Sequence, residues 1–170
     1  MPDGTTAHIG LGANLGDAPA TLQAALRALA ALPGCRLLAV SSLYGSAPVD
    51  AEGPDFINAV AVLHTQLAPL DLLDALQAIE QRFGRQRPYP NAPRTLDLDL
   101  LLAGDTVLQT ARLTVPHPRL HQRAFVLQPL LELAPDLCAP GLGPLAAHLS
   151  ATAGQRVQRL GPLEPLPTVS

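Results

Sequence analysis

The sequence predicts an α+β fold in which helices pack on the faces of an antiparallel sheet. Apolar runs of strand length alternate with segments whose leucines follow the helical period, and this alternation is the main reason for the prediction. In addition, the 170 residues are 48% hydrophobic, which is enough for one compact domain with a substantial core. We expect a single domain over residues 1–160 and a frayed tail over residues 161–170.

The first half of the chain predicts three strands and one helix. Leu22, Leu26 and Leu29 recur at helical spacing after Asp17, which is a favourable N-terminal cap. Proline and glycine residues between residues 45 and 54 indicate a loop. The expected elements are a strand at 8–13, a helix from Asp17 to about Gly34, a strand at 35–44, the loop at 45–54 and a strand at 55–66.

The second half begins with a helix that Pro69 opens and Gly84 ends. An arginine- and proline-rich loop follows at 84–93 and leads into the apolar run "TLDLDLLLA" at 95–103, which predicts a strand. The remaining expected elements are a turn at 104–105 that leads the chain back toward "TVLQT" at 106–110, a helix at 123–133 and a small helix at 145–152. The order β-α-β-β-α-β is typical of a ferredoxin-like antiparallel sheet with helices packed on it.

Charge and composition exclude some function classes. The net charge is −3, which disfavours a general binder of nucleic acid or of anionic membranes. No apolar run approaches the length that spans a membrane, and the N-terminus lacks the features of a signal peptide. Cys35 and Cys138 are far apart and lack metal-ligand spacing. We therefore expect a cytoplasmic protein with reduced cysteines.

Two carboxylates interrupt the apolar run at 95–103. Residues i and i+2 of a strand lie on the same face, about 6.5–7 Å apart, so Asp97 and Asp99 should project together while Leu96, Leu98 and Leu100 face a core. A divalent cation would relieve their mutual repulsion, and Mg²⁺ accepts one or two carboxylates together with water and phosphate oxygens. The alternative is a half-exposed strand whose solvent face is simply acidic.

Arginines flank this acidic pair, with Arg94 three residues before Asp97 and Arg85 and Arg87 in the preceding loop. Cations beside a metal–carboxylate centre indicate a polyanion between them, and a triphosphate with magnesium is such a polyanion. The alternative is that the loop arginines are solvated charges that pair locally with Glu80. The residues alone thus predict an α+β domain with a magnesium–phosphate site.

The segment "APRTLDLDLLLAG" resembles the signature of the 6-hydroxymethyl-7,8-dihydropterin pyrophosphokinase family of folate biosynthesis. The resemblance extends over nearly the whole chain, through "IGLGANLGD", "SSLYGSAPV", "PDFINAV", "LLDALQAIEQRFGRQR" and "RLTVPHPRLHQRAFVLQPLLELAP". It implies transfer of the β,γ-pyrophosphoryl group of ATP to the hydroxymethyl oxygen of the pterin, with release of AMP. It also implies a monomer whose partners are these two small molecules.

The resemblance assigns roles to residues around the acidic pair. Asp97 and Asp99 would hold two Mg²⁺ ions, and Arg85 and Arg94 would be the catalytic arginines, Arg85 on a mobile lid. The positions that contact ATP in the family correspond here to Glu80, Arg87, Leu100, Arg112, Thr114, His117 and Arg123. His117 could alternatively be an ordinary loop histidine.

For the pterin, the resemblance implies a flat site between two aromatic rings. Phe56 and Phe125 would flank the heterocycle and Asn58 would offer a donor and an acceptor to its edge, while the loop at Ser46, Ala47 and Val49 would close the site. The alternative for the phenylalanines is the ordinary core. An amide in mid-strand needs hydrogen-bond partners in either case.

A glycine-rich segment and a competing function each have an alternative interpretation. The segment "GLGANLG" has the spacing G-x-G-x-x-x-G, which is not that of a dinucleotide fingerprint, and we interpret it as a tight strand-to-helix turn. The competing function is a non-catalytic ligand-binding module in which the acidic pair holds a structural cation. An arginine-bearing lid, which such a module would not need, favours the enzyme.

Overall fold

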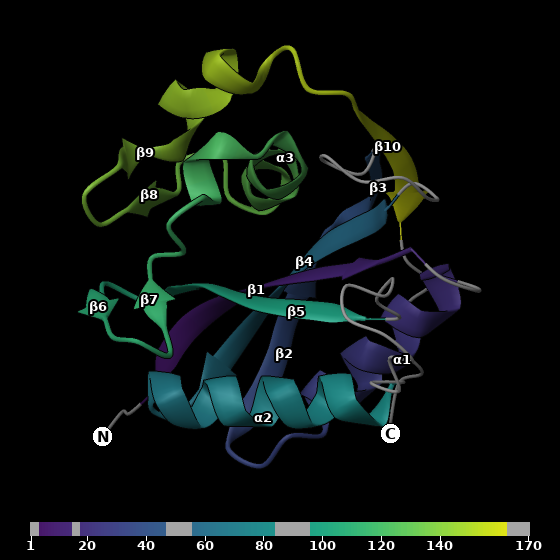
Figure 1. Cartoon of the computed structure of the whole chain (residues 1–170), viewed down its shortest axis with the longest axis vertical. Coiled ribbons are helices and arrows are strands. Elements are labelled where there is room, and N and C mark those ends of the chain that lie inside the picture. The colour runs from purple at the N-terminus through teal and green to yellow at the C-terminus, as the bar shows by residue number, and fades with distance from the viewer. Residues whose placement is uncertain (1–3, 15–17, 47–55, 84–95, 163–170) are drawn as a thin grey trace.

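The computed structural model describes residues 4–14, 18–46, 56–83 and 96–162 (Figure 1). Its larger elements are β1 (Thr5–Ala13), α1 (Ala18–Ala30), β2 (Cys35–Val40), β3 (Ser42–Ser46), β4 (Phe56–Thr65), α2 (Pro69–Arg82), β5 (Asp97–Ala103), α3 (Ala124–Leu133) and β10 (Val157–Pro162). Shorter ones are β6 (Leu108–Gln109), β7 (Thr114–Val115), β8 (Cys138–Ala139), β9 (Gly143–Pro144) and the 3-10 helices η1 (Leu120–Gln122) and η2 (Leu145–Thr152).

The main sheet is antiparallel, and its strands follow the order β10-β3-β4-β1-β5, with β2 also paired to β4. Strands β2 and β3 lie on the same side of β4 and together take the place of the second strand of the β-α-β-β-α-β unit. The four strands of that unit, which are β1, β2 with β3, β4 and β5 in chain order, therefore lie in the sheet in the order second, third, first, fourth, as in a ferredoxin-like sheet. The predicted α+β fold is confirmed.

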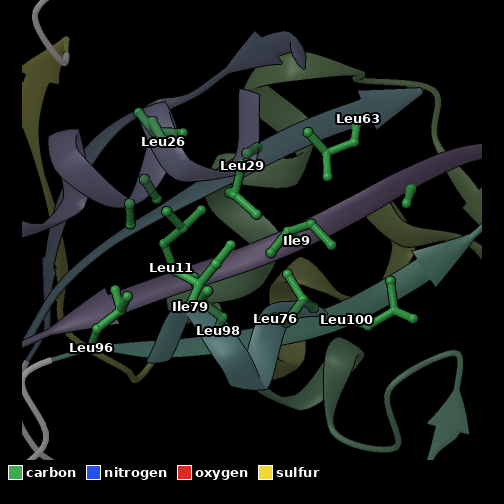
Figure 2. Packing of buried hydrophobic residues seen from close by; sticks show 14 of the residues in the cluster. Ile9, Leu11, Leu26, Leu29, Leu63, Leu76, Ile79, Leu96, Leu98 and Leu100 are labelled. Atoms are coloured by element: carbon green, nitrogen blue, oxygen red, sulfur yellow. The ribbon is translucent and has the colours of Figure 1, made fainter. Parts of the chain in front are cut away.

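Helices cover both faces of this sheet. Figure 1 shows α1 and α2 on one side and α3 on the other. The predicted stripe of Leu22, Leu26 and Leu29 is fully buried on the α1–α2 side. Figure 2 shows Leu96, Leu98 and Leu100 in the same cluster. A second apolar cluster, which includes Leu101, Leu127 and Leu130, lies on the α3 side. Among the described residues, no helix is both long and apolar enough to span a membrane.

The segment predicted as one strand at 35–44 is divided at Ser41. The Ser41 N–H donates to the Val60 carbonyl at 2.9 Å, and the Val60 N–H donates to the Ser41 hydroxyl at 2.9 Å. This side chain therefore replaces one rung of the backbone ladder, as serine does where its hydroxyl competes with regular structure. Strand β3 then continues through Gly45 and Ser46, which the sequence analysis placed in a loop.

The chain end also differs from the expectation. Gly161 and Pro162, which were expected in the frayed tail, pair with Leu43 and Ser42 at the end of β10. An unpaired β3 would expose a row of backbone donors and acceptors, and the returning chain satisfies them. The boundary of the predicted tail at residue 161 is therefore wrong. Residues 163–170 lie outside the described part of the chain.

Glu132 ties α3 to strands β3 and β10. The Ser42 N–H donates to both carboxylate oxygens at 3.1 Å, and the Ser42 and Tyr44 hydroxyls donate at 3.0 and 2.7 Å. Arg159 of β10 lies 3.6 Å from the same carboxylate. Burial opposes ionisation of Glu132, but these hydrogen bonds outweigh it and lower its pKa. Burial, together with the Glu132 contact, raises the pKa of Tyr44 to about 12.

Glu132→Gln is expected to lower the free energy of unfolding at pH 7 by about 2 kcal/mol. The NH₂ group of the new amide would face the N–H and hydroxyl groups of Ser42 and Tyr44, which are themselves donors, so hydrogen bonds would be lost. Asp136→Asn, which makes the same charge change at an exposed side chain, is the control and should have little effect. Since the pKa of Glu132 is lowered on folding, its stabilisation is present above the ordinary value of 4.5 and lost as the pH falls through the folded-state value. Urea unfolding at pH 7 and pH 3.5 measures both effects; an equal loss in the two variants would contradict the role of Glu132.

Candidate functional site

A cavity of about 720 Å³ lies on the α3 face of the sheet. The strands β1, β3, β4 and β5 form its floor, and residues from η1, α3 and the start of β10 form its walls. The lining residues are Gly10, Leu11, Gly12, Ser46, Phe56, Asn58, Ala59, Val60, Asp97, Asp99, Leu101, Arg119, Gln122, Arg123, Phe125, Val126, Gln155, Arg156 and Val157.

The register of the central strands explains why no side chains fill the middle of the cavity floor. Gly12 of β1 lies between Asn58 of β4 and Asp97 of β5, and Gly10 lies in the same way next to Asp99. Directly opposed residues of antiparallel strands share a face, so the missing side chains of both glycines leave space between the amide and the carboxylates. Both glycines belong to β1, within the strand predicted at 8–13. Of the predicted strand-to-helix turn that follows, residues 15–17 lie outside the described residues.

Asp97 and Asp99 are half-buried and line the cavity, whereas Leu98 and Leu100 point into the core on the opposite face. The predicted alternation along β5 is confirmed. Carboxylates are the ligand type that Mg²⁺ prefers, and the ion commonly takes its remaining ligands from water and phosphate. Among the described residues, no group of three or more His, Cys, Asp or Glu side chains is placed to hold a metal ion.

The amide of Asn58 has a fixed orientation. Its nitrogen donates to the Ser46 hydroxyl at 2.7 Å and lies 3.5 Å from the Tyr44 carbonyl. Asn58 and Ser46 are only 5% and 6% exposed, so these contacts satisfy a donor that would otherwise be buried alone. The amide oxygen lies over Gly12, where an added Cβ would be only 3.2 Å from it. Asn58 therefore presents mainly an acceptor to the cavity.

Phe56 and Phe125 are not among the buried residues of either hydrophobic core cluster. Phe56 and Phe125 are half-buried, and both line the cavity. The Arg123 guanidinium carbon lies 5.6 Å from the centre of the Phe125 ring, within the range of a cation–π contact. The cavity thus combines aromatic surfaces, an oriented amide, an acidic pair and a cation.

Five of the described residues expected to contact ATP are not among the residues that line this cavity: Glu80, Leu100, Arg112, Thr114 and His117. The Glu80 carboxylate accepts a hydrogen bond from the Leu98 N–H at 2.8 Å and so covers the outer edge of β5. The side chain of Leu100 is buried in the core, which leaves only its backbone for a ligand. Thr114 lies in β7, and Arg112 forms an exposed ion pair with Asp74.

His117 lies beside the cavity. Its backbone N–H donates to the carbonyl of Leu101, which lines the cavity, and its Nδ1 accepts from the Arg119 N–H at 3.1 Å. Burial and then the positive charge of Arg123 lower the pKa of His117, while Asp97 acts in the opposite direction. The ring is therefore neutral at pH 7 and carries its proton on Nε2, where it can donate to an anion.

Five predicted site residues, Ala47, Val49, Arg85, Arg87 and Arg94, lie outside the described residues. Conversely, the structure adds lining residues that the sequence analysis did not select. Gly10 and Gly12 could have been found, because two glycines at i and i+2 of a strand empty one face of it. Arg119, Gln122 and the segment 155–157 carry no comparable local signal, since they reach the cavity only through the return of the chain.

Comparisons with known proteins identify the family to which the chain belongs. A model of the 7,8-dihydro-6-hydroxymethylpterin-pyrophosphokinase (HPPK) family matches residues 8–135. The chain is 51% identical over 154 residues to the 2-amino-4-hydroxy-6-hydroxymethyldihydropteridine pyrophosphokinase of Pseudomonas aeruginosa, a match that covers 90% of this chain and 95% of that protein. It is 43% identical to the Haemophilus influenzae enzyme of the same name, over 92% and 99% of the two chains.

Solved structures resemble the fold as well. Wild-type HPPK-DHPS of Plasmodium falciparum superposes with a TM-score of 0.71 at 14% identity, covering 87% of this chain and 44% of that one. The A437G variant gives the same TM-score with 88% and 46% coverage. The chain spans less than half of these solved chains, and the likeness establishes the fold alone. The family match and the close relatives show more: the chain belongs to the HPPK family, the pyrophosphokinases of folate biosynthesis.

Proposed function

We propose that the cavity binds the pterin and the triphosphate of ATP on either side of Gly12. The observation that carries this proposal is the row Asn58–Gly12–Asp97 across β4, β1 and β5. With strands about 4.8 Å apart, the amide and the carboxylate are separated by about 10 Å across an open floor. A heterocycle held by the amide would then have its substituent directed toward groups suited to phosphates.

The pterin end would consist of Ser46, Phe56, Asn58 and Phe125. The two aromatic faces suit a flat bicycle, and the Asn58 oxygen suits the N–H groups along the edge of a pterin. Ala47 and Val49 would add backbone groups, as the family resemblance implies. Because the Asn58 nitrogen is engaged by Ser46, the amide would select a ligand that donates to it.

The phosphate end would consist of the acidic pair and nearby cations. Asp97 and Asp99 would hold two Mg²⁺ ions, which neutralise charge on the phosphate oxygens. Arg123 and the Nε2–H of His117 would donate to the remaining oxygens. Glu80, Arg87, Leu100, Arg112 and Thr114 stay predicted ATP contacts, and Arg85 and Arg94 stay predicted catalytic arginines.

In the reaction, the hydroxymethyl oxygen of the pterin attacks the β-phosphorus of ATP and loses its proton. The bond from that phosphorus to the α,β-bridging oxygen breaks, and AMP leaves. The part of the residues is to hold the two substrates in line, to exclude water and to place positive charge where negative charge develops. No residue needs to form a covalent bond to phosphorus.

One assay tests the proposal. The protein is mixed with ATP, MgCl₂ and 6-hydroxymethyl-7,8-dihydropterin, and the nucleotide products are separated. AMP formed in equal amount to the pterin diphosphate is expected, and chelation of magnesium should stop the reaction. ADP as the product would indicate a simple kinase, and tight binding of both ligands without turnover would indicate the non-catalytic binding module. We also propose a monomeric, cytoplasmic enzyme, which sedimentation and cell fractionation can test.

A further inference from the structure

Strand β5 has a bulge at Leu101, next to the acidic pair. Ile9 of β1 pairs with Leu100 of β5. The residue before it, His8, pairs with Leu102, so Leu101 is left over as the extra residue of a β-bulge. Leu100 belongs to the core cluster on the α1–α2 side, whereas Leu101 and Leu102 both belong to the cluster on the α3 side. The bulge therefore turns an additional leucine toward the cavity face of the sheet.

The Leu101 side chain bounds the open floor of the cavity on the side of Gly10. It lines the cavity, is only 1% exposed, and its two methyl carbons would lie 3.4 and 3.5 Å from a Cβ added at Gly10. A Cβ added at Gly12 would instead meet the Asn58 amide oxygen and the Phe56 ring. Because Leu101 is packed into the apolar cluster on the α3 side, it forms a rigid boundary that does not yield to an added group.

This boundary runs along one side of the row Asn58–Gly12–Asp97. Gly10 and Gly12 lie on the same face of β1, about 6.5–7 Å apart along the strand. A flat bicycle that lies across the strands over Gly12 would therefore have one long edge against Leu101. Since Leu101 belongs to β5, it would meet that edge at the end that carries the substituent directed toward Asp97.

The chemistry of the boundary decides which ring atom faces it. In a 6-hydroxymethyl-7,8-dihydropterin, two ring atoms flank the carbon C6 that carries the substituent: N5, which is a hydrogen-bond acceptor, and C7, which is a methylene group. The side chain of Leu101 offers only apolar groups. An N5 atom buried against it would lose its hydrogen bond to water without gaining a partner, whereas C7 gains an apolar contact. The apolar boundary therefore favours the orientation in which C7 faces Leu101.

We propose that Leu101 is a specificity-determining residue that packs against C7 of the pterin and excludes ligands with a substituent at that carbon. This proposal rests on the proposed function, because it takes the pterin to lie over Gly12. The role belongs to the side chain alone. The backbone carbonyl of Leu101 accepts a hydrogen bond from the His117 N–H at 2.9 Å, and a substitution at Leu101 keeps that carbonyl.

The test compares the affinities for 6-hydroxymethyl-7,8-dihydropterin and for its 7-methyl derivative by titration calorimetry, with a non-hydrolysable magnesium–ATP analogue present. The wild type should bind the 7-methyl derivative about tenfold or more weakly, because a close-packed apolar wall discriminates against one added methyl group by about that factor. Leu101→Ala should bring the two affinities within about twofold of each other, since the space of the lost side chain accepts the methyl group. The affinity for the nucleotide analogue alone should stay within about twofold of the wild type, because the carbonyl that holds His117 remains.

Leu102→Ala is the matched control. It removes the same atoms from the neighbouring residue of β5, which is 2% exposed, belongs to the same apolar cluster and is not among the residues that line the cavity. It should lower the free energy of unfolding as Leu101→Ala does and leave the discrimination between the two ligands unchanged. Leu101→Val is a smaller truncation that serves if Leu101→Ala does not fold, and it should reduce the discrimination by less.

Three results would overturn the role of Leu101. They are a wild type that binds both ligands equally well, an unchanged discrimination in the Leu101 variants, and an equal loss of discrimination in Leu101→Ala and Leu102→Ala. These outcomes are distinct from failure of the proposed function, which would appear as a wild-type protein that binds no pterin or releases no AMP.

Discussion

Asp97→Ala is expected to lower turnover by about a thousandfold or more while the metal-free protein stays folded. The side chain is half-buried at the cavity, and its partner Asp99 lies on the same face of β5. Loss of one carboxylate removes a proposed magnesium ligand, and charge stabilisation by a bound metal is worth several kcal/mol in the transition state. The same change relieves repulsion between two neighbouring carboxylates in the absence of metal. Single-turnover AMP formation and urea unfolding in EDTA measure the two effects.

The matched control is Asp105→Ala, which removes the same charge from an exposed turn after β5. It should keep near-wild-type turnover. Asp97→Asn keeps the shape of the side chain and should lose activity nearly as fully as alanine does, because a neutral amide is a poor ligand for Mg²⁺. If Asp97→Ala unfolds while wild-type turnover is indifferent to chelators, the acidic pair has a structural role and the metal assignment is wrong.

Gly12→Val should abolish productive pterin binding, with a loss of affinity of about a hundredfold or more. A Cβ at this position would lie 3.2 Å from the Asn58 amide oxygen and 3.9 Å from the Phe56 ring, and the valine methyl groups would fill the floor between the amide and Asp97. Valine suits a strand, so the sheet itself should tolerate the change. Calorimetric titration with the pterin, together with far-UV circular dichroism, measures both quantities.

Gly154→Val is the control for Gly12→Val. An added Cβ at Gly154 meets no atom within 4 Å, so this variant should bind the pterin like the wild type. A Gly12→Val protein that is folded and keeps its pterin affinity would show that the heterocycle does not occupy the space above β1. In that case, the Asn58 amide would serve only to form its hydrogen bonds to β3.

The fold class and part of the site could be predicted because their signals are local. The leucines at 22, 26 and 29 follow the period of one helix, and the alternation of Asp97 and Asp99 with leucines follows the period of one strand. Each pattern reflects which side of a single element is buried. The family resemblance added the roles of Ser46, Phe56, Asn58, Arg123 and Phe125, and all five line the same cavity.

The sequence by itself determined the α+β fold, the two-faced strand β5 and the family to which the chain belongs. Only the tertiary structure decided that Gly10 and Gly12 lie in the floor of a cavity, that Ser41 divides a strand, and that Gln155 and Arg156 reach the cavity. In each case the deciding contact joins residues far apart in the chain, such as Gln155 with Ala124 or Gly12 with Asp97. Such contacts depend on how whole elements pair and pack, and no window of neighbouring residues records that pairing.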